Sequence, residues 1–257
     1  MSISYPGRTI YPAMGRLNKR PSYNCSSAGT EITVPGSSSS PAVVMIDGKI
    51  YENVADVTCD LDTTGAISAG RGSIDTGSIA ANIPYYLYGI SGVSGLGFDV
   101  IASADPPTTG PTGFTSWTYI GACATRDTLA SFNTFRSSGG VLRREFTSGY
   151  HLHIEDANIY TAIDVKIPVH AHSVYLWLSL SSINAALDKG YISMDGSTGT
   201  ITNEAVTTSD NVNTGIELAL REAQTIYAKT LNNAGGNTAT RIDIYIMGWQ
   251  EDPMEYA

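Results

Sequence analysis

Short stretches of alternating polarity, separated by turns rich in Gly, Pro and Ser, recur along the whole chain. The clearest is Arg241–Met247, in which every second residue is isoleucine and the residues between include Asp243 and Tyr245. Period-2 alternation is the pattern of a strand that buries one face. Many short strands joined by such turns are typical of β-sandwiches and jelly rolls. We therefore predict an all-β fold with a β-sandwich or jelly-roll-like body.

A β-hairpin is predicted between residues 43 and 51. The apolar stretches Val43–Ile46 and Lys49–Tyr51 flank the dipeptide Asp47-Gly48. This dipeptide supplies the positive φ angles that a two-residue type I′ turn requires.

The segment Asn213–Leu231 fits two patterns. Its apolar residues recur at helical spacing, and Thr214 and Glu217 match a capping box. The same segment also contains alternating apolar residues and the β-prone tripeptide Thr225-Ile226-Tyr227. The pattern by itself leaves helix and hairpin open.

Charge and proline are unevenly distributed. The chain of 257 residues has 15 Lys and Arg against 24 Asp and Glu, a net charge of −9. Four of the basic residues precede the first acidic residue, Glu31, and residues 1–41 contain five prolines. Proline at this density disfavours helices and central strands. We therefore predict an extended basic N-terminal arm over 1–41, a β-rich domain over 42–147, and a second β-rich domain, or the second half of the same sandwich, over 148–257.

Composition argues against several classes of partner. An acidic, Lys-poor chain is poorly suited to nucleic acid, because neutralising phosphates requires clustered basic residues. Its longest apolar runs span five residues, too few to cross a bilayer, and the N-terminal residues lack an apolar signal core. Cys25, Cys59 and Cys123 have no CxxC spacing, so we expect reduced thiols in the interior and maturation in a reducing cytoplasm. A disulfide or a metal site is the alternative for these cysteines.

Motifs of the common enzyme classes are missing. The sequence has no GxSxG elbow, Walker A loop or HExxH helix, so we expect no enzyme, no catalytic residues and no cofactor. The histidines form two His-x-His pairs, His151/His153 and His170/His172, and residues i and i+2 of a strand project to one face. We expect no metal site. These four histidines are the candidate ligands if a metal is bound. The enzymatic alternatives are a metal-dependent hydrolase that uses the histidine pairs and a depolymerase that uses paired carboxylates.

The block around residues 82–122 resembles a module of tailed-bacteriophage virion proteins. The resemblance rests on Tyr85-Tyr86-Leu87-Tyr88, on Ser103-Ala104 followed by Pro111-Thr112-Gly113-Phe114-Thr115, and on Tyr119-Ile120-Gly121. It covers about 43–147 and the last strands, and Trp117-Thr118-Tyr119 replaces a basic pair often found before the Ile-Gly. The resemblance also favours a hairpin over a helix for Asn213–Leu231.

A virion structural protein is the function that this resemblance implies. We expect a capsid decoration or cement protein, a symmetric homotrimer that binds the major capsid protein and its own neighbouring copies on the virion. A basic arm can dock on an acidic neighbour, so the expected contact residues are Tyr5, Arg8, Tyr11, Arg16, Lys19 and Arg20. The alternative is a tail, fibre or adaptor protein that binds a receptor glycan, with Trp117, Trp177 and Trp249 as candidate stacking residues.

Overall fold

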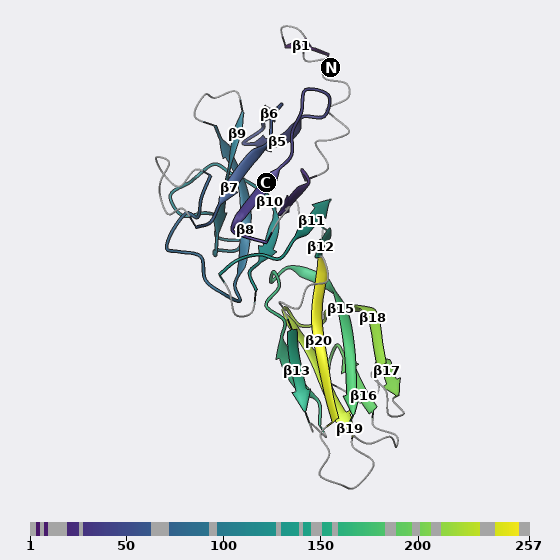
Figure 1. Ribbon diagram of the computed structural model, residues 1–257. Coiled ribbons are helices and arrows are strands. Elements are labelled where there is room, and N and C mark those ends of the chain that lie inside the picture. Colours follow the sequence, from purple (N-terminus) through teal and green to yellow (C-terminus); the bar gives the residue numbers. More distant parts are fainter. Residues whose placement is uncertain are drawn as a thin grey trace. The chain divides into compact units, whose positions relative to one another are not determined.

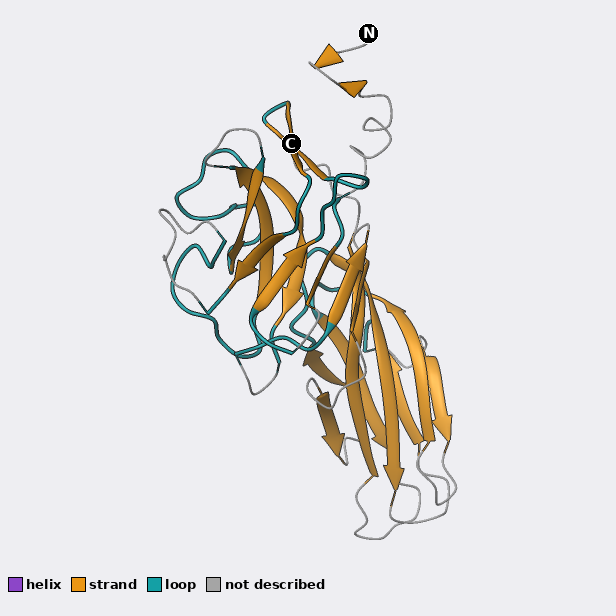
Figure 2. Ribbon diagram, turned by 45° about the horizontal axis from the view of Figure 1, so that its top comes forward, coloured by secondary structure: helices purple, strands orange, loops and turns teal. Residues whose placement is uncertain are grey.

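The computed structural model consists of strands joined by loops (Figures 1 and 2). It describes residues 4–5, 8–9, 20–25, 28–62, 72–92, 97–126, 130–138, 141–144, 151–155, 159–182, 189–196, 201–206, 212–231 and 240–251. Every regular element in these ranges is a strand, which confirms the all-β prediction. No helix in these ranges is long and apolar enough to span a membrane.

The chain divides into two compact units. Unit 1 comprises Met1–Leu142 with Pro253–Ala257, and unit 2 comprises Arg143–Asp252. The division falls within the strand β12 (Val141–Arg144), a few residues before the boundary at 147/148 that we expected from the sequence.

Unit 1 contains four sheets or parts of sheets. Strands β8 (Pro84–Ser91), β9 (Phe98–Ser103) and β10 (Thr118–Ala124) form an antiparallel sheet with β8 in the centre. A second sheet has the order β11-β3-β4-β7, built from β3 (Tyr23–Cys25), β4 (Glu31–Val34), β7 (Val57–Asp60) and β11 (Phe135–Ser138). Two pairs complete the unit: β5 (Ala42–Ile46) with β6 (Lys49–Asn53), and β1 (Ser4–Tyr5) with β2 (Arg8–Thr9).

Besides the two-residue strands β1 and β2, two strands with buried residues, β3 and β4, lie inside the range 1–41 that we expected to be an extended arm. Tyr23 and Cys25 of β3 are buried, as are Ile32 and Val34 of β4, so both strands follow the period-2 pattern. The prolines at 21, 35 and 41 lie outside the two strands, where they break no ladder hydrogen bond. Residues 20–41 therefore belong to the β-rich body of unit 1.

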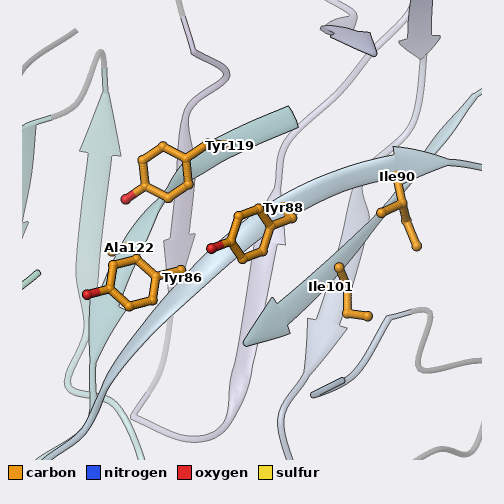
Figure 3. Packing of buried hydrophobic residues seen from close by; sticks show 6 residues of the cluster. All are labelled: Tyr86, Tyr88, Ile90, Ile101, Tyr119 and Ala122. Atoms are coloured by element: carbon orange, nitrogen blue, oxygen red, sulfur yellow. The ribbon is translucent and has the colours of Figure 1, made fainter. Parts of the chain in front are cut away.

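An aromatic cluster fills one side of the central strand β8. Tyr86, Tyr88 and Ile90 alternate along β8; the rings of Tyr86 and Tyr88 meet Tyr119 of β10, and Ile90 lies on the Ile101 side of the cluster (Figure 3). The Tyr88 hydroxyl donates to the carbonyl oxygen of Asp105 at 2.7 Å, which satisfies the polar end of a fully buried side chain.

A second tyrosine joins β3 to the sheet of β8. The Tyr23 hydroxyl donates to the carbonyl oxygen of Ala122 at 2.7 Å, and its ring covers the backbone of Gly121. A Cβ atom on Gly121 would lie 2.4 Å from the Tyr23 hydroxyl oxygen, so this close approach requires glycine. The Ile120-Gly121 dipeptide of the phage-like motif is explained by this packing.

Unit 2 is a two-sheet β-sandwich. One sheet has the order β18-β15-β20, with β13 on the far edge of β20. Its strands are β13 (His151–Glu155), β15 (Ala171–Ser182), β18 (Val212–Ala219) and β20 (Thr240–Glu251). The other has the order β14-β19-β16-β17, with β14 (Thr161–Asp164), β16 (Lys189–Ser193), β17 (Ile201–Val206) and β19 (Thr225–Leu231). Between the sheets lie apolar residues that alternate with outward polar ones, among them Leu176, Leu218, Ile226 and Ile244.

The segment Asn213–Leu231 is two strands, but they do not form a hairpin with each other. Strand β18 pairs with β15 and strand β19 pairs with β14 and β16, so the chain crosses from one sheet to the other at about residue 222. The expectation of strands is confirmed, and the hairpin pairing is wrong because each strand buries its apolar face against the opposite sheet.

A β-bulge reverses the inward-facing positions of β20. Tyr175 pairs with Gly248 and Leu176 pairs with Ile246, so Met247 is the extra residue. Before the bulge the even-numbered isoleucines face the core, and after it Trp249 and Glu251 are buried instead. Gly248 has φ 152°, a conformation that residues with a Cβ atom rarely adopt.

The three cysteines are free and buried, as we predicted for reduced thiols that fill the interior. Cys59 donates to the carbonyl oxygen of Ser73, and desolvation by burial raises its thiol pKa. A buried neutral thiol of this kind behaves as a small apolar side chain.

Candidate interaction surfaces

The β5–β6 hairpin forms as the sequence predicted, and it exposes apolar side chains. Asp47 and Gly48 have φ angles of 50° and 73°, as a type I′ turn requires. Met45 is paired with Ile50 across the hairpin, so both side chains lie on one face. Their exposed fractions are 51% and 43%, and that of the nearby Val54 is 52%. We call Met45, Ile50 and the outer edge of β6 the hairpin surface.

Strand β6 leaves the edge of Lys49–Tyr51 open, whereas Asn53 lies against Gly97 and donates to the carbonyl oxygen of Phe98. Among the described strands its one partner is β5, which packs against β8 and β10. An edge strand presents backbone donors and acceptors that can pair with another chain. The hairpin surface thus combines an open strand edge with an exposed apolar pair.

The expected arm contacts lie in different settings. Tyr5 and Arg8 are paired across the small β1–β2 sheet. The guanidinium of Arg20 lies 4.8 Å from the centre of the Tyr119 ring in unit 1, so this residue packs on its own chain. Tyr11, Arg16 and Lys19 lie outside the described residues.

The strand parts of the phage-like motif are internal. Tyr85, Tyr86, Leu87 and Tyr88 are all buried in β8. The turn beyond Ser103 is held by Trp117, whose ring meets Tyr88 edge-on at 5.1 Å and lies over Gly110. The strand parts of the motif accordingly specify the core of unit 1, whereas Thr112, Gly113 and Thr115 of its turn are exposed.

The three candidate tryptophans have different roles. Trp249 is fully buried and donates from its indole nitrogen to Glu251 at 3.2 Å. Trp117 is half-buried against Tyr88. Trp177 is 36% exposed on the outer face of the sheet β18-β15-β20, so of the three it is the one placed to stack on a ligand.

Trp177 lies in a row across three strands. It is paired with Gly215 of β18 on one side and with Tyr245 of β20 on the other. In the neighbouring rows Ser179 is paired with Asp243, and Tyr175 with Glu217. We call these outward residues of β18, β15 and β20 the Trp177 face. The alternation of polar and apolar residues in the sequence could have indicated that Tyr245 faces outward, but nothing in it indicates that Gly215 lies beside Trp177.

Charged groups on the Trp177 face are paired or stacked. Arg241 forms a 2.6 Å ion pair with Asp243, and the guanidinium of Arg143 lies 3.5 Å from the centre of the Tyr175 ring. Burial and a hydrogen bond with Glu217 raise the pKa of Tyr175, against a smaller lowering effect from Arg143, so the phenol is neutral at pH 7. Each of these two arginines therefore contacts a side chain of the same face: Arg241 contacts the Asp243 carboxylate, and Arg143 contacts the Tyr175 ring.

The two histidine pairs are far apart. In β13, His151 and His153 are paired with Tyr245 and Asp243 of β20. His170 instead contacts Glu251, six positions along β20 from Tyr245, a distance of about 20 Å. One site built from all four histidines is therefore excluded.

The second histidine pair does not have the strand geometry that we expected. His172 lies in β15, where it is half-buried and its carbonyl oxygen accepts the backbone N–H of Leu220 at 2.8 Å. His170 precedes this strand and lies in a turn, so the rule that residues i and i+2 share a strand face does not apply to the pair.

No metal site is found at the candidate histidines. The described residues contain no group of three or more His, Cys, Asp or Glu that could hold a metal ion. The candidate ligand roles of His170 and His172 therefore have no support in this part of the chain, and the side chains of His151 and His153 lie outside what the structure describes.

His170 belongs to a buried polar cluster. Its Nε2 lies 3.3 Å from the Glu251 carboxylate, and both side chains are more than nine-tenths buried. The same carboxylate accepts the indole N–H of Trp249. The cluster has no open approach, because both carboxylate oxygens are occupied and all three side chains are internal.

Comparison with known proteins gives no family. No protein-family model matches the sequence, and no curated protein matches it. The solved structures that it resembles include the VP2 subviral particle of infectious bursal disease virus, at 11% identity over 97% of this chain and 79% of that one, with a TM-score of 0.20. The Gx strain structure of that virus has 11% identity over 96% and 72% of the chains and a TM-score of 0.19. Scores this low carry no inference about fold or function.

Proposed function

We propose that this chain is a structural protein of a virus particle, a decoration or cement protein that binds the outer surface of the shell and stabilises it. The observation that carries the proposal is the hairpin surface, on which Met45 and Ile50 are exposed beside the open edge of β6. A strand of the shell protein could pair with this edge while its side chains cover the apolar pair.

Two further features agree with this role. The chain is weakly charged, with 15% Asp, Glu, Lys and Arg, and rich in tyrosine, a residue suited to polar, adaptable contacts. The buried Tyr85–Tyr88 motif resembles modules of tailed-phage virion proteins. From that resemblance we propose the major capsid protein and neighbouring copies as partners, a trimer as the assembly, and the virion as the location.

The direct experiment measures shell binding. Purified protein is mixed with empty shells that lack it, the particles are sedimented, and the bound copies are counted. The proposal expects many copies per shell and a higher melting temperature of the shell. Absence of binding would overturn the decoration role and favour a tail, fibre or adaptor protein.

A double substitution tests the hairpin surface. Met45→Glu with Ile50→Glu should abolish shell binding, because two carboxylates would have to be buried in the contact. Thr58→Glu, at an exposed position of β7, is the matched control that adds charge elsewhere on unit 1. Shell binding that persists in a folded double variant would show that the hairpin surface is not the contact.

The expected arm contacts are tested separately by deleting residues 1–19. The deletion stops before Arg20 and Tyr23, because Tyr23 is buried and its hydroxyl bonds to Ala122 within unit 1. If the arm binds the shell or a neighbouring copy, the truncated protein should stay folded and bind fewer copies. Full binding by the truncated protein would refute the role of Tyr5, Arg8, Tyr11, Arg16 and Lys19.

A further inference from the structure

The Trp177 face presents one accessible indole ring on a flat sheet. Gly215 has no side chain, and a Cβ atom there would lie 3.5 Å from Cε3 of Trp177, so the indole is in contact with the backbone of β18. Strands β18, β15 and β20 run side by side in unit 2 (Figure 1), so residues of all three strands border the indole. The ring is held at the surface and is 36% exposed.

Polar groups surround this ring. Ser179 and Asp243 occupy the next row on one side, and Glu217 occupies the row on the other side. The Ser173 hydroxyl donates to Glu217 at 3.0 Å, and Arg241 is paired with Asp243. Carboxylates fixed by such partners keep further lone pairs that accept hydrogen bonds.

We propose that the Trp177 face binds a neutral pyranose sugar of a surface polysaccharide. A pyranose has an apolar face of C–H groups that stacks on an aromatic ring, and a rim of hydroxyl groups that both donate and accept hydrogen bonds. One exposed ring bordered by carboxylates and hydroxyls provides both kinds of contact within the same three strands.

The chemistry of the face distinguishes this ligand from others. The core of a protein–protein interface is depleted of charged residues, whereas here Glu217 and Asp243 lie in the rows beside the indole. Among the described side chains of the face, Arg143 and Arg241 balance Glu217 and Asp243. A face without net charge favours a neutral sugar over a sialylated or phosphorylated one.

The site binds one sugar ring weakly. Arg143 covers the Tyr175 ring, so Tyr175 offers no second stacking surface, and Tyr245 flanks the indole in the same row. We expect a Kd on the order of 1 mM for one chain, with tighter binding where several copies act together. This inference is independent of the decoration role, because the Trp177 face lies in unit 2 and the hairpin surface in unit 1.

The test uses cellohexaose and chitohexaose as neutral probes and polygalacturonate as an anionic one. Binding is followed by tryptophan fluorescence and by ligand-observed NMR on the full chain. We expect a neutral probe to change the emission, Trp177→Ala to weaken binding at least about tenfold, and Trp177→Phe to keep it within about threefold. Trp117→Phe is the matched control, because it removes an indole from unit 1 and should leave the affinity unchanged.

Three results would overturn the proposal. They are the absence of binding by either neutral probe at about 10 mM, undiminished binding by a folded Trp177→Ala variant, and binding of the anionic probe alone. Circular dichroism of each variant establishes that the sandwich is intact. A failed shell-binding experiment leaves this test unaffected, because it measures a different surface.

Discussion

The buried cluster of His170, Glu251 and Trp249 is the part of unit 2 where one substitution should have the largest effect. The carboxylate of Glu251 is 1% exposed, accepts a hydrogen bond from Trp249, and lies 3.3 Å from Nε2 of His170. His170→Ala would remove one donor and leave the carboxylate buried with fewer partners. A buried carboxylate in that state is strongly destabilising.

The magnitude follows from the number of donors that remain. Depriving a buried polar group of one partner costs about 1–3 kcal/mol, and more when the group is charged. Because Glu251 carries a carboxylate but keeps the Trp249 indole as a donor, we expect about 3 kcal/mol. For a unit of about 100 residues this free energy lowers the melting temperature by roughly 12 °C.

Urea unfolding in a Trp117→Phe background measures this cost, because the remaining tryptophans, Trp177 and Trp249, both lie in unit 2. Adding Glu251→Gln to His170→Ala should recover about 1–2 kcal/mol, since a neutral amide replaces the poorly partnered charge. His170→Gln, which keeps a donor, should also recover part of the loss. A loss below about 1 kcal/mol for His170→Ala, or no recovery in the double variant, would refute the reasoning.

Two further predictions concern unit 1. Gly110→Ala should cost about 2–3 kcal/mol in urea unfolding, because Gly110 has φ 76° and a Cβ atom would lie 2.5 Å from the Trp117 ring. Gly113→Ala, with φ 85° and nothing within 4 Å, should cost only about 1 kcal/mol, and equal losses would contradict the steric argument. Burial raises the pKa of the Tyr85 phenol in the folded protein above its ordinary 10.0. As the pH rises past 10, the phenol of the unfolded chain therefore loses its proton before that of the folded protein. The free energy of unfolding consequently falls as the pH rises above 10. Tyr85→Phe should reduce this alkaline loss in pH-dependent melting curves, and an unchanged slope would contradict the assignment.

The local sequence pattern predicted those strands that bury the side chains of one face and expose those of the other. The hairpin at 43–51 follows from one dipeptide, Asp47-Gly48, and the strand at 241–247 from strict alternation. Strands β3 and β4 were not predicted, because they are short and lie among the prolines at 21, 35 and 41. Their formation depends on tertiary partners, such as the Tyr23 contact with Gly121, that no local pattern contains.

The candidate surfaces were less predictable than the fold. Trp177 and Trp249 both lie in alternating stretches, yet one is exposed and the other fully buried. The difference arises from the bulge at Met247, which shifts the inward positions of β20 by one residue. Nothing in the sequence around Gly248 distinguishes a bulge from an ordinary strand glycine, so the accessible indole could be identified only from the register.

The central position of β20 affects how the protein is made. Strand β15 pairs with β20 along its entire length. In the sequence, however, about 60 residues separate the end of β15 from Thr240, the first residue of β20. At 5–20 residues per second, a ribosome needs roughly 3–12 s to bridge that interval. During this time the nascent sandwich presents a long apolar strand without its main partner, which is a template for association between neighbouring nascent chains. Crowded polysomes should therefore aggregate this protein more readily than refolding of the finished chain would suggest.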